Sequence, residues 1–271
     1  MPHSIPALCG SLAGQPFTFN VKVHNEAYRV LGVDYTFVSF GVEDIAGAVN
    51  AMRTLGIRGL NVTMPHKQTV MAHLDALDET ARAIGAVNTI DNRDGWLTGY
   101  NTDCEGAVRA LEEATPLQGR RIALLGAGGA ARAIAWGMQR AGAHVSIFNR
   151  TESRGRALAD DFGLAFGGDL AAFDPSGFDG VVNATAAGFR APDINPLRAQ
   201  QLEPHLFVLD AAFIPVRTKL IRDAAAIGCR VVDGTRMLLH QFCGQVELYT
   251  GKKAPIEAMS AALLDEIARV G

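Results

Sequence analysis

The chain has 271 residues, 48% of them hydrophobic and 20% charged, which is typical of a soluble globular protein with one large or two ordinary domains. Its 25 Lys and Arg against 28 Asp and Glu give a formal net charge of −3, so composition favours neither nucleic acid nor an anionic membrane as a partner. Apolar runs such as Ile122–Leu125 are far shorter than the ~20 residues that span a bilayer. Met1–Pro6 has no basic segment leading into an apolar core, so we expect no signal peptide and a cytoplasmic protein.

The four cysteines are widely spaced and contain no Cys-x-x-Cys pair. Free cysteines that pack as small apolar residues are typical of a reduced cytoplasm. A zinc site made from all four is the less favoured alternative, and we expect no metal.

Short strands and helices alternate in the first part of the chain. Val33–Phe40 is rich in β-branched and aromatic residues and predicts a strand. Val42–Leu55 has apolar residues at helical spacing before Gly56, which predicts a helix. Gly59–Val62 predicts a short buried strand, followed by a polar turn after which Lys67 opens the next helix.

A hairpin and then a second series of elements follow. Ala86–Ile90 and Trp96–Tyr100 flank the turn-forming run Asp91–Gly95 and predict a hairpin. From about residue 104 onward, apolar runs predict further strands, with one helix over Ala130–Ala141 and helix throughout from Met237. The predicted strands are Arg121–Leu125, His144–Phe148, Gly180–Asn183, Phe207–Leu209 and Cys229–Val232. Strands that alternate with helices indicate an α/β fold with a mostly parallel sheet.

A glycine-rich turn links the strand Arg121–Leu125 to the helix after it, in the pattern Gly126-x-Gly128-x-x-Ala131. In dinucleotide-binding folds the first glycine allows a tight turn, the second lets pyrophosphate approach the backbone, and the last small residue lets helix and strand pack closely. The helix N-terminus offers free N–H groups and partial positive charge to the phosphates. Glycine-rich turns also occur without a nucleotide, but the strand and helix around this one favour a cofactor site. Its candidate residues are Gly126, Ala127, Gly128, Gly129 and Ala130.

The end of the second strand favours NADP over NAD. An NAD site usually has Asp or Glu there, about 20 residues on, to hold the ribose 2′-hydroxyl. Near that distance this chain has Asn149, followed by Arg150, Thr151 and Arg154. A guanidinium can bind a 2′-phosphate with two charge-assisted hydrogen bonds, whereas a carboxylate would repel it. The alternative is that both arginines are surface residues at a helix start, where positive charge opposes the helix dipole.

Polar side chains recur at three element ends of the first unit, in Asn61–Lys67, Gly85–Thr89 and Gly99–Asp103. Ligands of α/β sheets bind beyond the carboxyl ends of strands, so these side chains are expected to converge on a cleft. Lys67 can donate a proton to a developing alkoxide, and a nearby Asp103 would keep it oriented and charged. Lys67 taken alone fits a solvated helix residue better than a catalytic one, so the hypothesis depends on the whole set of side chains.

Together these motifs closely resemble those of the shikimate dehydrogenase family. The resemblance covers nearly the whole chain, and its segments agree in order and spacing: Asn61–Lys67, Gly85–Asn88, Tyr100–Asp103, Gly126–Ala131, Asn149–Thr151, Asn183–Thr185 and Met237–Gln241. It implies an N-terminal α/β substrate domain, a Rossmann NADP domain and C-terminal helices that return to the first domain. We place their limits at 1–103, 104–236 and 237–271.

The resemblance also implies the chemistry. Lys67 and Asp103 would be the catalytic pair for reversible hydride transfer between NADPH and 3-dehydroshikimate, which gives shikimate. Substrate hydroxyls would be held by Thr63, Asn88 and Gln241, and we count Asn61 of the same motif among the substrate-binding residues. The walls of the NADP site would include Asn183, Thr185, Gly234 and Met237.

One segment departs from the family's pattern. The family usually has a Ser-x-Ser-Pro pair that binds the substrate carboxylate before His-Asn, but here Phe17–Val23 precedes His24-Asn25 without a serine. The family's usual tyrosine after a late strand, another carboxylate donor, is Phe213 here. Candidate replacements in the substrate site are Thr18, Asn20 and Lys22. The alternatives are that Lys22 is a solvated helix residue and that Asn20 caps the helix.

Shikimate is therefore the expected substrate, with quinate or a related polyhydroxy ring acid as the alternative within the class. A non-catalytic NADPH-binding sensor is a different class, which Lys67 and Asp103 disfavour because a sensor needs no proton-transfer pair. A metal-dependent enzyme is disfavoured because the sequence lacks a His-rich helix or paired-carboxylate spacing. We expect a small-molecule substrate as the only partner and a monomer or homodimer.

Overall fold

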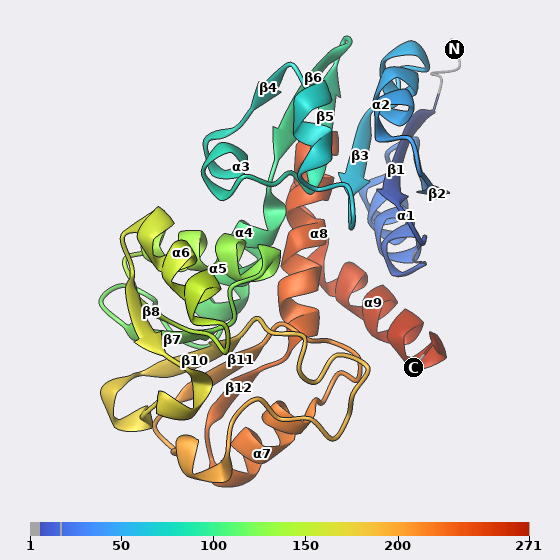
Figure 1. Cartoon of the computed structure of the whole chain (residues 1–271). Helices are drawn as coiled ribbons and strands as arrows, with labels where there is room; N and C mark the ends of the chain where they lie inside the picture. The colour runs from blue at the N-terminus through green and yellow to red at the C-terminus, as the bar shows by residue number, and fades with distance from the viewer. Residues whose placement is uncertain (1–5, 17, 271) are drawn as a thin grey trace. The chain divides into compact units, whose positions relative to one another are not determined.

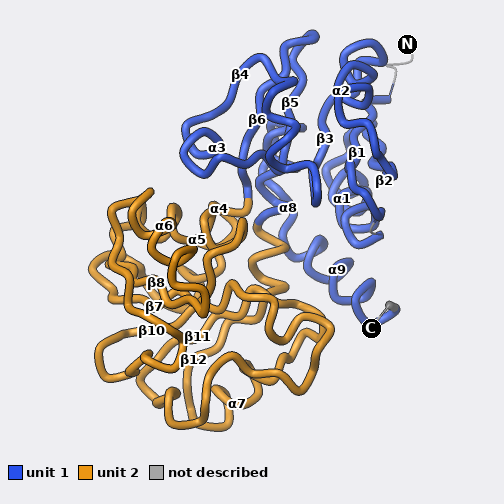
Figure 2. Tube along the Cα trace, in the orientation of Figure 1, with its two compact units in different colours: residues 1–102, 241–270 blue, residues 103–240, 271 orange. Residues whose placement is uncertain are grey.

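The computed structural model describes residues 6–16 and 18–270. Two predictions involve residues outside these ranges. The expected lack of a signal peptide rests on the first five residues, and the predicted substrate segment includes Phe17. The chain divides into two compact units, shown in Figure 2: unit 1 comprises Met1–Thr102 with Gln241–Val270, and unit 2 comprises Asp103–His240. Among the described residues, no helix combines the length and apolar character that a membrane span needs.

Unit 1 contains a six-stranded mixed sheet with the order β2-β1-β3-β5-β6-β4 (Figure 1). Its strands are β1 (Ala7–Ala13), β2 (Tyr35–Gly41), β3 (Gly59–Val62), β4 (Ala76–Leu77), β5 (Thr89–Arg93) and β6 (Trp96–Tyr100). β1 pairs in parallel with β2 and β3, whereas β5 is antiparallel to both β3 and β6. The helices are α1 (Phe19–Leu31), α2 (Ile45–Thr54), η1 (Thr69–His73), α3 (Glu79–Ile84), α9 (Ile256–Val270) and the second part of α8 (Gly234–Thr250).

Local sequence explains where the helices of unit 1 begin and end. α2 begins after Asp44, whose side chain accepts a hydrogen bond from the backbone N–H of Gly47 at 3.0 Å. α1 ends at Gly32, which has φ 61° and closes the helix in the left-handed conformation. α2 contributes Val49 and Met52 to a core that includes Leu60 of β3, so burial of apolar side chains holds the helix on the sheet.

Unit 2 contains a six-stranded sheet with the order β12-β11-β10-β7-β8-β9, in which every pair is parallel. Its strands are β7 (Arg121–Leu125), β8 (His144–Phe148), β9 (Ala165–Gly168), β10 (Gly180–Asn183), β11 (Phe207–Asp210) and β12 (Arg230–Val232). The helices are α4 (Thr102–Glu112), α5 (Gly129–Arg140), α6 (Glu152–Phe162), η2 (Leu170–Ala172), η3 (Pro175–Gly177), η4 (Ala199–Gln201), α7 (Lys219–Ile227) and the first part of α8. This strand order, which reverses direction between β7 and β10, is that of the Rossmann fold.

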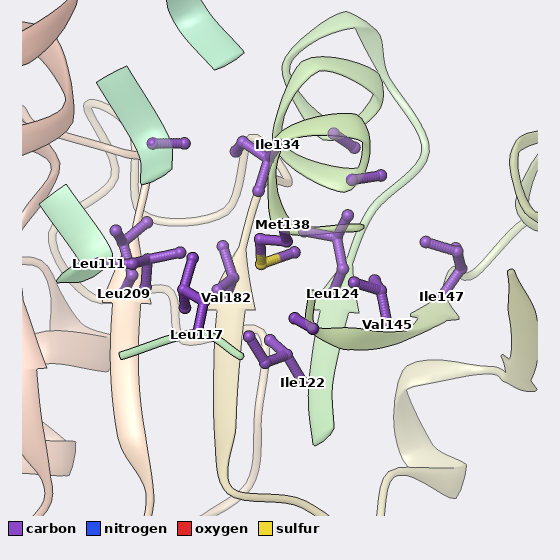
Figure 3. Packing of buried hydrophobic residues seen from close by; sticks show 14 of the residues in the cluster. Leu111, Leu117, Ile122, Leu124, Ile134, Met138, Val145, Ile147, Val182 and Leu209 are labelled. Atoms are coloured by element: carbon purple, nitrogen blue, oxygen red, sulfur yellow. The ribbon is translucent and has the colours of Figure 1, made fainter. Parts of the chain in front are cut away.

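The core of unit 2 explains its apolar strands. Strands of a parallel sheet are covered on both faces, and β10 and β11 are buried along their whole length. Figure 3 shows Ile134 and Met138 of α5 packed toward Leu124 and Val182 of the sheet. This packing fixes α5, and with it the turn that precedes the helix.

Several predicted bounds are confirmed: β3, β7, β8 and β10 begin and end as expected. The first hairpin strand was predicted wrongly, because it is Thr89–Arg93 and the turn is confined to Asp94-Gly95. Both turn residues have positive φ, 53° and 89°, and a two-residue turn of this kind matches the twist of the flanking strands.

Two helix predictions also need correction. Lys67 does not open a helix, because it lies in a run of turns in which His66 N–H donates to the Thr63 carbonyl, and a short 3-10 helix begins only at Thr69. The C-terminal segment is helical as predicted, but not throughout, because it forms two helices, α8 and α9. Gly251, at φ 68°, ends α8, and Pro255 precedes the start of α9.

Candidate active site

A cavity of about 540 Å³ lies at the carboxyl ends of β7, β8 and β10 in unit 2. The strand order reverses between β7 and β10, which is where ligands of open α/β sheets bind. The cavity is lined by most of the predicted cofactor residues and by five others. The lining consists of Gly126, Ala127, Gly128, Asn149, Arg150, Thr151, Arg154, Leu170, Ala184, Thr185, Ala186, Ala187 and Pro196.

The glycine-rich turn leaves room for a ligand at the backbone. Gly126 has φ 109°, and a Cβ there would stand 3.0 Å from the carbonyl oxygen of Ala184, so the turn excludes a side chain. A Cβ on Gly128 would meet no protein atom within 4 Å, although Gly128 lines the cavity. The space that a side chain would fill is therefore open to a ligand. α5 begins at the next residue, so its free N–H groups are available to phosphate oxygens.

One wall of the cavity is basic. Arg150 and Arg154 line it, are exposed, and form no salt bridge within residues 6–16 and 18–270. Arg156, on the same helix as Arg154, differs because its guanidinium pairs with Glu152 at 2.7 Å and lies 4.9 Å from the centre of the Phe166 ring. Two unpaired guanidinium groups and no carboxylate at the end of β8 suit an anionic ligand such as a 2′-phosphate.

The loop after β10 is shaped by buried polar groups. Asn183 is fully buried and does not line the cavity. Its side-chain oxygen accepts hydrogen bonds from Thr185 N–H at 3.0 Å and Thr185 Oγ1 at 2.7 Å, and its nitrogen donates to Asp210 at 2.8 Å. Asp210, at the end of β11, also accepts from Thr218 Oγ1 at 2.6 Å. Burial raises the pKa of Asp210 above its ordinary value. Asn183 therefore positions Thr185 and does not itself line the cavity. Sequence analysis missed Asp210 and Thr218.

The remaining predicted cofactor residues lie outside the cavity lining. Gly129 and Ala130 form the first turn of α5. Gly234 and Met237 lie in the first turns of α8, where Met237 packs in the core of unit 2. A Cβ on Gly234 would come within 2.5 Å of the Ala212 carbonyl oxygen, so close packing accounts for this glycine.

In unit 1, two predicted substrate residues belong to a buried polar network. Asn61 donates to Gln245 Oε1 at 2.6 Å and accepts from the Tyr249 hydroxyl at 2.6 Å. Asn88 Oδ1 accepts from the backbone N–H of Thr102 at 2.8 Å and from the Thr89 hydroxyl at 2.8 Å. The sequence motifs indicated Asn61 and Asn88, but nothing in them indicated that Gln245 and Tyr249 of α8 are the partners of Asn61.

The turn that carries Lys67 is tied to the sheet by its backbone. Val87 N–H donates to the Lys67 carbonyl at 2.8 Å, and Thr63 N–H donates to the Leu12 carbonyl at 3.0 Å. Lys67 and Thr63 are both half-buried. The turn therefore holds Lys67 close to the residue that precedes Asn88.

The predicted replacements for the serine pair lie at the start of α1. Thr18, the residue before the helix, donates its hydroxyl to Glu266 of α9 at 2.7 Å. Asn20 does not cap α1: it is buried in the first turn, where Oδ1 accepts from Val21 N–H at 3.0 Å. Lys22 is exposed and lines a groove between α1 and α9 together with Asp265.

Glu266 is a buried carboxylate that sequence analysis did not single out. Arg269 pairs with it at 2.6 Å, and hydrogen bonds from Arg269 and then Thr18 lower its pKa to about 2. It therefore remains charged at neutral pH. Since Thr18 and Glu266 are far apart in sequence, only the packing of α9 against α1 brings them together.

The two remaining predicted residues lie near the unit boundaries. Asp103, predicted to be catalytic, is buried in the first turn of α4 and is the first residue of unit 2. Gln241, predicted to bind substrate, is half-buried on α8. It is the residue at which the chain returns from unit 2 to unit 1. Among the described residues, no three His, Cys, Asp or Glu side chains form a cluster that could hold a metal.

The parallel sheet, the glycine-rich turn and the cavity at the reversal of strand order define unit 2 as a dinucleotide-binding domain. One family model agrees with this class, and two others match segments that precede and follow its match. Residues 121–187 match "NADP oxidoreductase coenzyme F420-dependent", residues 16–90 match "Shikimate dehydrogenase substrate binding domain", and residues 234–264 match "Shikimate 5'-dehydrogenase C-terminal domain".

Individual relatives identify the family. An NADP(+) shikimate dehydrogenase of Pyrococcus abyssi is 40% identical over 95% of this chain and 98% of its own length. A crystal structure of a shikimate dehydrogenase in complex with NADP+ has a TM-score of 0.91 at 34% identity, over 96% of each chain. The ligand-free 5-ketofructose reductase of Gluconobacter sp. strain CHM43 also has a TM-score of 0.91, at 33% identity over 96% of this chain and 99% of the other. The chain belongs to the shikimate dehydrogenase family.

Proposed function

We propose that the protein catalyses the reversible NADP-dependent oxidation of shikimate to 3-dehydroshikimate, a step in making aromatic amino-acid precursors. The observation that carries this proposal is the near full-length match to enzymes named NADP(+) shikimate dehydrogenase. The basic cavity of unit 2 supports it, because the wall that would face the adenosine ribose has arginines in place of a carboxylate.

The cavity of unit 2 fits the dinucleotide. Gly126–Gly128 and the first turn of α5, with Gly129 and Ala130, would hold the pyrophosphate, because a Cβ on Gly128 would occupy open space beside free helix N–H groups. Asn149–Thr151 and Arg154 would hold the adenosine ribose and its 2′-phosphate. Thr185, positioned by Asn183, would contact the cofactor from the loop after β10, and Gly234 and Met237 would complete the site.

Lys67 and Asp103 would carry the proton chemistry. When bound, NADPH supplies the hydride to the ring ketone. Lys67 would donate a proton to the oxygen that becomes a hydroxyl and would take it back in the reverse direction. Asp103 would orient the ammonium group and stabilise its charge.

The substrate side of the site would come from unit 1. Thr63, Asn88 and Gln241 would bind ring hydroxyls, with Asn61 beside them in the β3 motif. In this assignment residues 1–103 bind substrate, 104–236 bind NADP, and 237–271 complete the substrate domain. We further propose a cytoplasmic monomer or homodimer that does not bind nucleic acid.

A second candidate function follows from the start of α1. The Thr18 hydroxyl, which would have replaced a carboxylate-binding serine, donates instead to the charged Glu266. Arg269 balances the charge of Glu266, so this pair offers no net positive charge to a substrate carboxylate and leaves it without the Thr18 hydroxyl as a donor. A neutral polyhydroxy ketone would not need this donor, and the similarly folded 5-ketofructose reductase is an enzyme named for such a substrate.

A substrate screen separates the two candidates. Shikimate and quinate are offered with NADP+ and the formation of NADPH is followed by absorbance; 5-ketofructose is offered with NADPH and its consumption is followed. We expect the highest kcat/KM with shikimate. Turnover of 5-ketofructose alone would replace the first proposal with the second, and turnover of none would contradict both.

A further inference from the structure

The centre of unit 1 contains a glutamine that joins three parts of the predicted substrate site. Gln245, on α8, is 0% exposed. Its Oε1 accepts from Asn61 of β3 at 2.6 Å, and its Nε2 donates to the hydroxyls of Thr89 at 3.2 Å and Thr102 at 3.3 Å. One side chain thus bridges β3, the start of β5 and the start of α4.

The partners of Gln245 hold the predicted site in turn. Thr102 Oγ1 accepts from Asn88 Nδ2 at 3.1 Å, and Thr102 N–H donates to Asn88 Oδ1 at 2.8 Å. Asn88 therefore acts as a remote cap for the first turn of α4, in which Asp103 is the next residue. The backbone of the same segment fixes the Lys67 turn, through Val87 N–H.

The network around Gln245 is not needed to fill the space between these elements. A buried amide costs free energy unless its polar atoms have hydrogen-bond partners, and apolar side chains of similar volume often fill such space without loss of stability. Fully satisfied networks in contrast fix one arrangement of the elements that they join. Here the network joins Asn61 of β3, Asn88 just before β5 and Thr102 at the start of α4. The arrangement that is fixed is therefore that of the predicted substrate side.

We propose that Gln245 is a positioning residue: it does not touch the substrate but holds Asn61, Asn88 and Thr102 in the arrangement that catalysis requires. This inference rests on the proposed function, and it assigns a role to a side chain outside all of the sequence motifs. A misplacement of about 1 Å in reacting groups can cost about 100-fold in rate, so the role is measurable.

Gln245→Met tests the proposal, because methionine keeps the length and approximate volume of the side chain and removes all three hydrogen bonds. We expect kcat to fall about 10- to 100-fold, while KM for NADP changes less than about twofold. We also expect the Thr102 amide to exchange its hydrogen faster, since its acceptor Asn88 is no longer held.

Asn92→Leu is the matched control. Asn92 is a buried amide of the same sheet, at the far end of β5, and its Nδ2 donates to the Ile57 carbonyl at 2.9 Å while Oδ1 accepts from Gly95 N–H at 2.8 Å. This variant should lower Tm but leave kcat and exchange at Thr102 unchanged. If Gln245→Met also lowers Tm and leaves both kcat and exchange unchanged, Gln245 is only structural and the proposal is wrong.

A milder variant keeps the test decisive if Gln245→Met does not fold. Thr102→Val removes one hydroxyl of the network and keeps the shape of the residue; it should lower kcat about 3- to 10-fold, within the range of one misplaced group. An unchanged kcat would overturn the proposal. If the protein turns over no candidate substrate, the proposed function is contradicted. Amide exchange needs no substrate, so exchange at Thr102 alone then decides whether Gln245 has the positioning role.

Discussion

Replacement of Arg150 by glutamine tests the assignment of the basic wall. Arg150 lines the cavity of unit 2 and has no salt-bridge partner among the described residues, so its charge is available to a ligand. A hydrogen bond to a charged group contributes about 1.5–3 kcal/mol, and about 1.4 kcal/mol changes Kd tenfold. Because Arg150 is exposed, solvent screening places the loss at the lower end of that range. We expect Arg150→Gln to raise Kd for NADP+ about tenfold.

The assay compares two cofactors and two variants by isothermal titration calorimetry. NAD+ lacks the 2′-phosphate, so its Kd should change less than about twofold in Arg150→Gln. Arg156→Gln is the control on α6, the helix that follows Arg150, since Arg156 pairs with Glu152 and does not line the cavity. It should leave both affinities unchanged. Equal weakening of NADP+ and NAD+ by Arg150→Gln would show that the arginine only supports the loop, and the reasoning about the 2′-phosphate would fail.

Three further predictions concern unit 1. Lys67→Ala should lower kcat by about 10²–10⁴ without unfolding the protein. The losses of activity in Lys67→Ala and Asp103→Ala should combine less than additively in the double variant. Near-normal turnover by a folded Lys67→Ala protein would refute the acid–base role. His24 is fully buried and burial lowers its pKa to about 4 from 6.5, so the unfolded chain binds its proton first as pH falls. Stability should therefore decline by up to about 3 kcal/mol between pH 6.5 and 4, and urea unfolding of His24→Phe should lack this part of the decline. Gly59→Ala should lower the free energy of unfolding by about 1–3 kcal/mol, because a Cβ there would stand 2.2 Å from the Tyr249 ring; an unchanged Tm would show that the ring can move aside.

Features that depend on neighbouring residues could be predicted from the sequence. The turn Gly126–Gly128 and the run Asn149–Thr151 each follow a strand directly, and strand ends of a parallel sheet meet at one edge. The cavity in unit 2 accordingly gathers both, together with Thr185. The first strand of the hairpin was predicted wrongly because Asp91 and Asn92 are residue types that favour turns. Both are instead buried in β5, where contacts with distant residues, such as that of Asp91 with Arg58, stabilise them.

Features that depend on packing between distant segments could not be predicted. Thr18 meets Glu266 only because α9 packs on α1, and Asn61 meets Gln245 only because α8 lies against β3. Asn183 was expected to line the cofactor site, but the structure turns it toward Asp210 on the neighbouring strand. Hydrogen-bond partners of a buried amide are set by tertiary structure, and no local spacing encodes them.

The most direct test of the account compares shikimate with its carboxamide, which keeps the ring and hydroxyls and removes the negative charge. Steady-state NADPH formation gives kcat/KM for each compound with NADP+ as the cofactor. Because a hydrogen bond to a charged group contributes about 1.5–3 kcal/mol, an enzyme for shikimate should favour the acid by about tenfold or more. Equal kcat/KM values would show that the protein has no carboxylate site, and shikimate would then not be its substrate.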